Sequence, residues 1–186
     1  MAMNDGLIYG KVRYSIQNGY AGWAGGYLDT RGAGCQDNVY CVSTAETPLR
    51  DAGSGLWVIK SAAHKPDGTP VHCNDRIYLV NQYADTGTFL DTRGAGCQDN
   101  AYCVSTAKTS DRDGGSGTWL IIPEQCETGI VTEGTTVRLL NGYGDFAGGF
   151  LDTRGAGCQG NKYCVSTSTY YNRDTGSTTW RFSSHL

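Results

Sequence analysis

Short apolar stretches rich in β-branched and aromatic residues recur along the chain and alternate with polar, turn-forming segments. Three of them lead into an asparagine, at Val12–Ile16, Arg76–Val80 and Thr136–Leu140. Further strands are expected around Leu28 and Val42 and at the tryptophan that ends each third of the chain. No stretch of ten residues repeats its apolar positions every 3.6 residues. The pattern therefore predicts an all-β chain with about twelve short strands and almost no helix.

One block of sequence, Leu28–Asn38, organises the whole chain. It recurs unchanged at Leu90–Asn100 and returns at Leu151–Asn161 with Gly160 in place of Asp. Each copy leads into Tyr-Cys-Val-Ser-Thr and, further on, into a Gly-rich turn and a tryptophan. A fixed period of this kind is the sequence signature of a repeat architecture. We expect one domain over residues 1–186, built from three repeats of about 62 residues at roughly 1–62, 63–124 and 125–186.

Three units of four short strands favour a β-trefoil with pseudo-threefold symmetry. In that fold six strands close a barrel and three hairpins cap one end, which leaves few exposed strand edges. Trp57, Trp119 and Trp180 keep one register across the repeats, and we expect them in the core or on the barrel floor. A three-bladed propeller is the alternative, but propellers usually have at least four blades.

Eight cysteines divide into three local pairs and two further residues. Each local pair has five intervening residues and flanks a turn, a separation that a disulfide can close. The expected bridges are Cys35–Cys41, Cys97–Cys103, Cys158–Cys164 and, between the second and third repeats, Cys73–Cys126. Zinc sites at the three pairs would each need two further ligands, and the three histidines are not repeated, so we expect no metal. Disulfides would place the chain in an oxidising, secreted or extracellular setting, although MAMNDGLIYG shows no signal-peptide pattern.

Charge and motifs exclude several function classes. The net charge of −3 offers no basic field for a nucleic-acid backbone. No apolar run approaches the roughly 20 residues of a membrane span. Gly32-Ala33-Gly34 lacks the spacing of a dinucleotide loop and the lysine of a phosphate-binding loop, so no cofactor is expected. Catalysis needs an asymmetric set of groups, whereas the recurring residues here are threefold, so the sequence predicts no enzyme.

Each repeat holds the groups that recognise one sugar: a carboxylate, an amide and an aromatic ring within a dozen residues. Several weak sites on one rigid frame gain affinity through effective concentration. The candidate carbohydrate-binding residues are Asp29, Asn38 and Tyr40; Asp91, Asn100 and Tyr102; and Asp152, Asn161 and Tyr163.

Other roles stay open for several of these residues. Asp29 and its copies are alternatively Asx-turn residues that bind the Gly-rich loop. Arg31, Arg93 and Arg154 either contact an anionic glycan or, as we favour, pair with the Asp residues at 51, 113 and 174. Trp23 and Phe146, which lie in loops that vary between repeats, are candidate exposed platforms.

The repeats resemble the ricin-B-type β-trefoil lectins, which carry a Leu/Val-Asp step, an Asn-x-hydrophobic stretch about ten residues later and a closing Trp. The first repeat matches with Leu28-Asp29, Asn38-Val39-Tyr40 and Trp57, and the other two match in the same register. Two features depart from that family. The Gln-x-Trp signature is Gly-x-Trp or Thr-x-Trp here, and the later pocket asparagine is Ala45, Ala107 or Ser168. The resemblance implies the trefoil fold more directly than a galactose preference.

These observations predict a non-catalytic lectin with up to three equivalent, shallow sugar sites, whose partners are glycans. Two other functions are compatible with a trefoil. A Kunitz-type protease inhibitor would act through one divergent loop, whereas these loops are nearly identical. A receptor-targeting module of a toxin or adhesin is the other alternative. The sequence does not identify the sugar or the oligomeric state.

Overall fold

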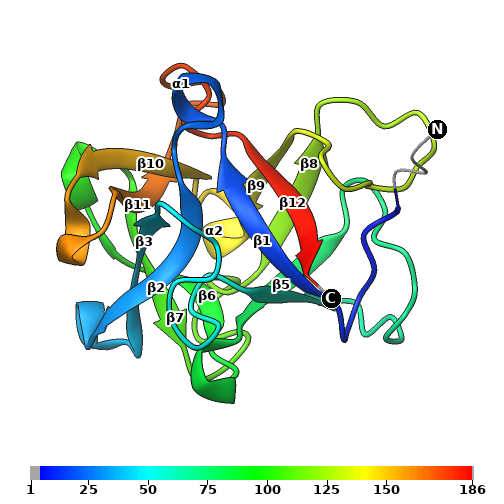
Figure 1. Ribbon diagram of the computed structural model, residues 1–186, viewed down its shortest axis with the longest axis horizontal. Coiled ribbons are helices and arrows are strands. Elements are labelled where there is room, and N and C mark those ends of the chain that lie inside the picture. The colour runs from blue at the N-terminus through cyan, green and yellow to red at the C-terminus, as the bar shows by residue number, and fades with distance from the viewer. Residues whose placement is uncertain (1–4, 186) are drawn as a thin grey trace.

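The computed structural model describes residues 5–185 and contains twelve strands, four from each repeat (Figure 1). The strands are β1 (Arg13–Asn18), β2 (Tyr27–Ala33), β3 (Tyr40–Ala45), β4 (Trp57–Ser61), β5 (Arg76–Asn81), β6 (Phe89–Ala95), β7 (Tyr102–Ala107), β8 (Trp119–Pro123), β9 (Val137–Asn141), β10 (Phe150–Ala156), β11 (Tyr163–Ser168) and β12 (Trp180–His185). The helical segments have three or four residues each: α1 (Tyr20–Trp23), α2 (Tyr143–Phe146), η1 (Cys35–Asp37), η2 (Tyr83–Asp85), η3 (Cys97–Asp99) and η4 (Cys158–Gly160). The prediction of an all-β chain with about twelve strands is confirmed.

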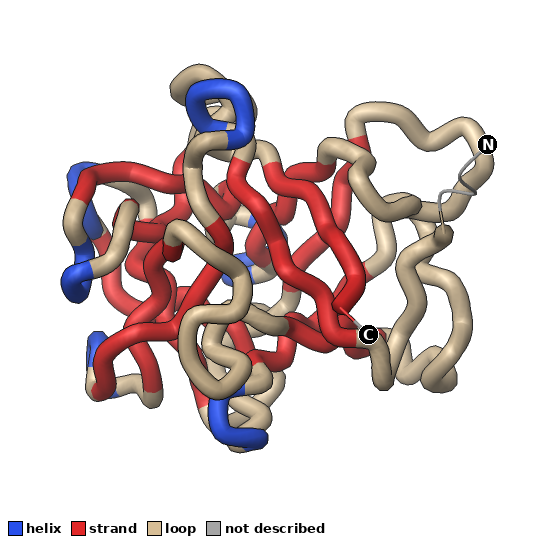
Figure 2. The backbone as a smooth tube through the Cα atoms, in the orientation of Figure 1, coloured by secondary structure: helices blue, strands red, loops and turns tan. Residues whose placement is uncertain are grey.

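Six strands form a closed antiparallel barrel. Around it, β1 pairs with β4, β4 with β5, β5 with β8, β8 with β9, β9 with β12, and β12 with β1 again. Each repeat contributes two of these strands, and every second pairing joins different repeats. Figure 2 shows the barrel strands crossing the centre of the molecule, with long loops on the right and strands joined to short helical segments on the left.

Three hairpins cover one end of the barrel. Strands β2 and β3 form the first, β6 and β7 the second, and β10 and β11 the third. The second strands of the hairpins pair with one another in a closed triangle, β3 with β7, β7 with β11 and β11 with β3. A six-stranded barrel with a triangular cap is the β-trefoil, so this prediction is confirmed and the propeller alternative is wrong.

The closing tryptophans lie in the core as predicted. Trp57, Trp119 and Trp180 are fully buried. Each indole Nε1 donates to the carbonyl oxygen of the leucine that precedes the repeated Asp: 2.9 Å to Leu28 in the first repeat, with matching bonds in the others. Burying an indole requires a partner for its N–H, and the repeated Leu-Asp step supplies it.

The end of the barrel opposite the cap is closed by one short segment from each repeat. Leu7, Val71 and Val131 are buried there, and their backbones form a cycle of hydrogen bonds. The amide of Leu7 donates to Val131, that of Val131 to Val71 and that of Val71 to Leu7, at 2.7–2.9 Å. This closure places the start of each repeat against the other two.

A partly buried carboxylate reinforces this closure. Asp75 accepts hydrogen bonds from the Tyr9 hydroxyl at 2.6 Å, the Lys65 ammonium at 2.8 Å and the His72 amide at 2.9 Å. Burial raises the pKa of Asp75, but these donors outweigh it and hold the pKa below its ordinary value of 3.8. Burial and the same carboxylate raise the pKa of Tyr9.

Four disulfides are present, and all four match the predicted pairs. The local bridges Cys35–Cys41, Cys97–Cys103 and Cys158–Cys164 each span a Cα–Cα distance of 5.0 Å. Cys73–Cys126 joins the second and third repeats at 6.3 Å. Bridges of this number indicate an oxidising environment. Within residues 5–185, no helix is long and apolar enough to cross a membrane.

Candidate binding sites between the repeats

The repeated Asp residues are not on the surface. Asp29, Asp91 and Asp152 have no exposed surface, and each accepts a bond from the arginine 21 residues later in its own repeat. The Nε-to-carboxylate distances are 2.8, 3.0 and 2.7 Å, from Arg50, Arg112 and Arg173 respectively. The same guanidinium groups donate to the carbonyl oxygen of the following threonine. Buried charges need such pairing, because an isolated ion in the interior is costly.

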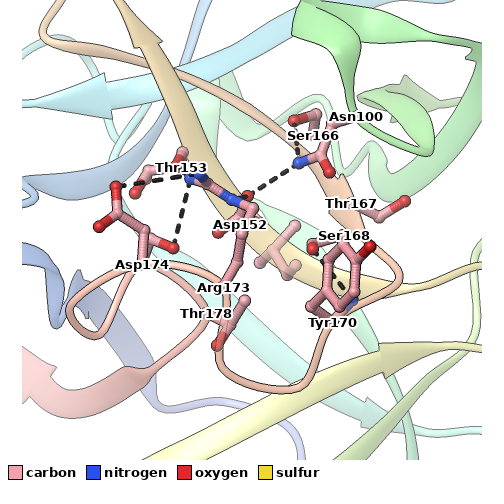
Figure 3. A network of polar contacts seen from close by, with 12 residues as sticks. Asn100, Asp152, Thr153, Ser166, Thr167, Ser168, Tyr170, Arg173, Asp174 and Thr178 are labelled. Atoms are coloured by element: carbon pink, nitrogen blue, oxygen red, sulfur yellow. Dashed lines mark hydrogen bonds and ion pairs between the residues drawn. The ribbon is translucent and has the colours of Figure 1, made fainter.

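The repeated asparagines reach into the neighbouring repeat. Asn161 donates to Asp29, Asn38 to Asp91 and Asn100 to Asp152, at 2.8–2.9 Å. Figure 3 shows the third case, in which Asn100 and Arg173 approach Asp152 from two sides. The polar ring, as we call it, consists of the three buried carboxylates with their arginines and asparagines: Asp29, Arg50, Asn161; Asp91, Arg112, Asn38; and Asp152, Arg173, Asn100.

This geometry corrects the sequence interpretation of the site. The predicted carboxylate and amide of one repeat, such as Asp29 and Asn38, bind different partners. The carboxylate has no exposed surface on which to meet a sugar hydroxyl. Its donors are arginine and asparagine side chains, so the Asx-turn alternative does not describe it either. The polar ring holds the repeats together.

The predicted pairing of Arg31 with Asp51 is also wrong. Asp51 lies 3.7 Å from Arg50, and the copies at 113 and 174 lie 4.0 and 3.9 Å from Arg112 and Arg173. These three carboxylates are about half exposed. Each arginine of the polar ring thus links a buried carboxylate to an accessible one.

A surface pocket lies against the first repeat where it meets the second. Strand β2 contributes Arg31, and the segment before β4 contributes Arg50 and Asp51. Tyr40 of β3 and Tyr83 of η2 form the aromatic wall. This first pocket has a volume of about 450 Å³.

The third repeat has an equivalent pocket where it meets the first. Its lining contains the matched residues Arg154, Tyr163, Arg173 and Asp174, with Tyr20 of α1 in the place of Tyr83. Its volume is about 210 Å³. Tyr40 and Tyr163 are therefore the predicted sugar-site residues that line the open pockets.

Each pocket wall is a pair of tyrosines from adjacent repeats. Tyr40 and Tyr83 meet edge to face with ring centroids 5.4 Å apart, and Tyr163 and Tyr20 do so at 5.5 Å. Tyr102 and Tyr143 repeat the arrangement at 5.5 Å beside the second repeat. Sequence reasoning missed the partner tyrosines at 20, 83 and 143, although each follows the strand-ending asparagine by two residues.

A further cavity lies between the first two repeats, and Arg112 is one of its lining residues. It has a volume of about 430 Å³ and is lined by residues that include Asp37, Asn38, Arg93 and Lys108. The predicted residue Asn38 thus faces both the polar ring and this cavity. All three copies of the arginine at 31, 93 and 154 line one of these cavities.

Trp23 and Phe146 are half-buried rather than free platforms. The guanidinium of Arg181 lies 4.2 Å from the centroid of the Trp23 ring, and that of Arg76 lies 4.9 Å from the centroid of Phe146. One aromatic face of each ring is therefore used by a cation–π contact.

Metal-ligating side chains do not gather in the part of the chain that the structure describes. Over residues 5–185 no group of three or more His, Cys, Asp or Glu side chains is placed to hold a metal ion. The chemistry that the pockets offer is hydrogen bonding by guanidinium and carboxylate groups beside aromatic rings.

Solved structures share this fold at low sequence identity. A Caenorhabditis elegans protein with unknown function matches at a TM-score of 0.74 and 19% identity, covering 98% of both chains. The SDF2-like protein from Arabidopsis thaliana matches at 0.73 and 14%, covering 96% of this chain and 95% of that one. The receptor-binding domain of the botulinum neurotoxin C/D mosaic serotype matches at 0.65 and 16%, over 97% of this chain and 43% of that chain. No protein-family model and no curated protein matches the sequence.

Proposed function

We propose that this chain is a non-catalytic carbohydrate-binding protein with up to three shallow sites, each where one repeat meets the next. The observation that carries the proposal is the recurrence of one pocket in two repeats. In both, a tyrosine pair, an accessible carboxylate and two arginines surround an open cavity.

The pocket components match the surface of a sugar. A pyranose has an apolar C–H face that packs on an aromatic ring, and hydroxyl groups at its edge that donate to a carboxylate and accept from a guanidinium. In the first pocket Tyr40 and Tyr83 supply the aromatic surface, while Asp51 and Arg50 supply the polar edge. We assign the hydroxyl-binding role to Asp51, Asp113 and Asp174 in place of the buried carboxylates.

Multivalent binding compensates for weak individual sites. A hydrogen bond to a sugar hydroxyl replaces one to water, so its net gain is small. Three sites on one β-trefoil frame raise the effective concentration for branched glycans. The partners we propose are extracellular glycans. The likeness to toxin receptor-binding domains supports a binding role, and receptor targeting is one use of such a lectin.

The test is glycan-array binding of a triple variant, Asp51→Asn, Asp113→Asn and Asp174→Asn. Replacing a carboxylate that accepts from hydroxyl groups removes charge-assisted hydrogen bonds, so we expect at least about a tenfold loss of signal. A control triple variant, Asp5→Asn, Asp67→Asn and Asp145→Asn, makes the same charge change at exposed positions outside both pockets.

The control should bind as the unmodified protein does. Equal array signals for the two triple variants would show that these carboxylates do not contact sugar. Absence of any glycan signal from the unmodified protein, together with inhibition of a protease panel, would favour the Kunitz-type alternative instead.

A further inference from the structure

A single substitution breaks the threefold identity of the repeated block, beside the first pocket. Gly160 stands where the other repeats have Asp37 and Asp99. The backbone at all three positions is left-handed, with φ of 68°, 57° and 56°. Within the repeated block of eleven residues, the difference is therefore one carboxylate side chain on a shared backbone. Two residues after it, Lys162 stands where the other repeats have Val39 and Ala101, and its ammonium is paired with Glu46 at 2.9 Å.

The missing side chain belongs beside Arg31. The Nη1 atom of Arg31 donates to the carbonyl oxygen of Gly160 at 3.1 Å. A Cβ atom added at Gly160 would lie 3.6 Å from Nη2 of the same guanidinium. At the next boundary the matched residues Asp37 and Arg93 line one cavity together. Gly160 is thus the one of the three matched positions that has no carboxylate side chain, and it lies against Arg31.

The other charges at the first pocket leave Arg31 as its available cation. Arg50 is held by buried Asp29 at 2.8 Å and has exposed Asp51 at 3.7 Å. Arg31 is exposed, and its guanidinium donates to a neutral carbonyl oxygen, that of Gly160. A guanidinium presents a planar fork of donors that matches a carboxylate or sulfate. The first pocket is also more than twice as large as the third, at about 450 against 210 Å³.

We propose that the first pocket selects a sugar with an anionic substituent, a carboxylate or a sulfate, which binds Arg31. The two other sites, where Asp37 and Asp99 occupy the matched position, prefer neutral sugars. This inference rests on the proposed function, since it assigns a ligand class to one of the same three sites.

The experiment is a ¹⁵N NMR titration of the full chain with D-glucuronate, galactose 6-sulfate and neutral galactose. The backbone amides of Gly32 and Gly155, which line the first and third pockets, report on each site separately. We expect one of the two anionic sugars to bind near Gly32 about two- to fivefold more tightly than galactose, the range that an exposed ion pair supports. The comparison of the uronate and the sulfate identifies which anion fits. Near Gly155 that preference is absent.

Variants at the broken position separate charge from shape. Gly160→Asp introduces the carboxylate that the other repeats carry and should abolish the preference near Gly32. Gly160→Asn adds nearly the same volume without charge, on a backbone conformation that asparagine tolerates, and should keep it. Asp99→Asn should create a preference for the anionic sugar near Gly155.

Two results would overturn the inference while leaving the proposed function intact: equal affinities for neutral and both anionic sugars near Gly32, or identical behaviour of Gly160→Asp and Gly160→Asn. If no sugar of either class shifts Gly32 or Gly155, the proposed function fails as well.

Discussion

Replacing one buried carboxylate of the polar ring tests whether these residues hold the fold or bind ligand. Asp91→Asn is the sharpest change, because the carboxylate has a partner on both oxygens. Oδ2 accepts from Arg112 at 3.0 Å and Asn38 at 2.9 Å, and Oδ1 accepts from Ser116 at 2.5 Å. An asparagine of the same shape keeps these contacts, with its Nδ2 donating to Ser116, but it carries no charge.

The expected cost follows from the two charge-assisted bonds on Oδ2. A hydrogen bond to an ionised group contributes about 1.5–3 kcal/mol, against about 1 kcal/mol for a neutral one. In the variant the Asn38 bond becomes a neutral one and Arg112 loses its ion-pair partner, which together lower the free energy of unfolding by about 2 kcal/mol. The side chain of Arg112 is only 26% exposed, so water replaces little of the loss. For a chain of this size, 2 kcal/mol corresponds to a fall in Tm of about 4–8 °C.

Asp113→Asn is the matched control, since it removes the other carboxylate beside the same guanidinium. Asp113 is 59% exposed and lies 4.0 Å from Arg112, so its removal should change stability by less than about 0.5 kcal/mol. Urea unfolding at pH 7 with a common m-value measures both variants. Equal midpoints for the two variants would refute the structural role of Asp91. So would a native-like Asp91→Asn protein that has lost glycan binding, because it would return the carboxylate to the ligand.

Two further predictions concern the disulfides and the Asp75 carboxylate. Double Cys→Ser variants compare the long-range disulfide with a local one. In the chain-entropy model, removing Cys73–Cys126, with a separation of 53 residues, lowers the free energy of unfolding by about 4 kcal/mol. Removing Cys97–Cys103, with a separation of 6, lowers it by about 2 kcal/mol. Urea midpoints of the double-serine variants measure both, and the reverse order would contradict the loop-length argument. Asp75→Asn should cost about 2 kcal/mol at pH 7. Because the folded pKa of Asp75 lies below 3.8, its contribution is present above that value and is lost as pH falls through the lowered pKa. The two proteins should therefore converge in stability as the pH falls below 3.8. A difference that is unchanged at low pH would exclude charge as its cause.

Much of the fold could be predicted because the repeat carries it. The shared block at Leu28–Asn38 and its copies fixed the count of strands and of local disulfides, and the register of Trp57 placed a core residue in every repeat. These features depend on residues that are close in sequence, and the three repeats show each of them three times. The cycle of backbone hydrogen bonds at the end of the barrel opposite the cap, in contrast, involves segments whose sequences differ between repeats. No repeated motif therefore predicted it.

The site could be predicted only in part, for a geometric reason. Tyr40 was found because it faces the pocket from its own strand. Asn38 lies ten residues from Asp29 in sequence yet donates to Asp91, because hairpin strands of consecutive repeats pair in the cap. The short spacing within a repeat therefore suggested the wrong partner for Asn38, namely Asp29 of its own repeat. The recurring Arg50-Asp51 step did carry the signal that a second carboxylate accompanies each arginine.

The polar ring and the pockets follow from one arrangement. Each repeat supplies a buried carboxylate whose amide donor belongs to its neighbour, so these bonds form only when all three repeats are assembled. Its residues are consequently the same in every copy. Position 160 and its counterparts lie on the exposed side of that ring, where a changed side chain leaves the buried bonds intact. Gly160 is therefore a position at which one pocket can acquire a different charge without loss of the shared frame.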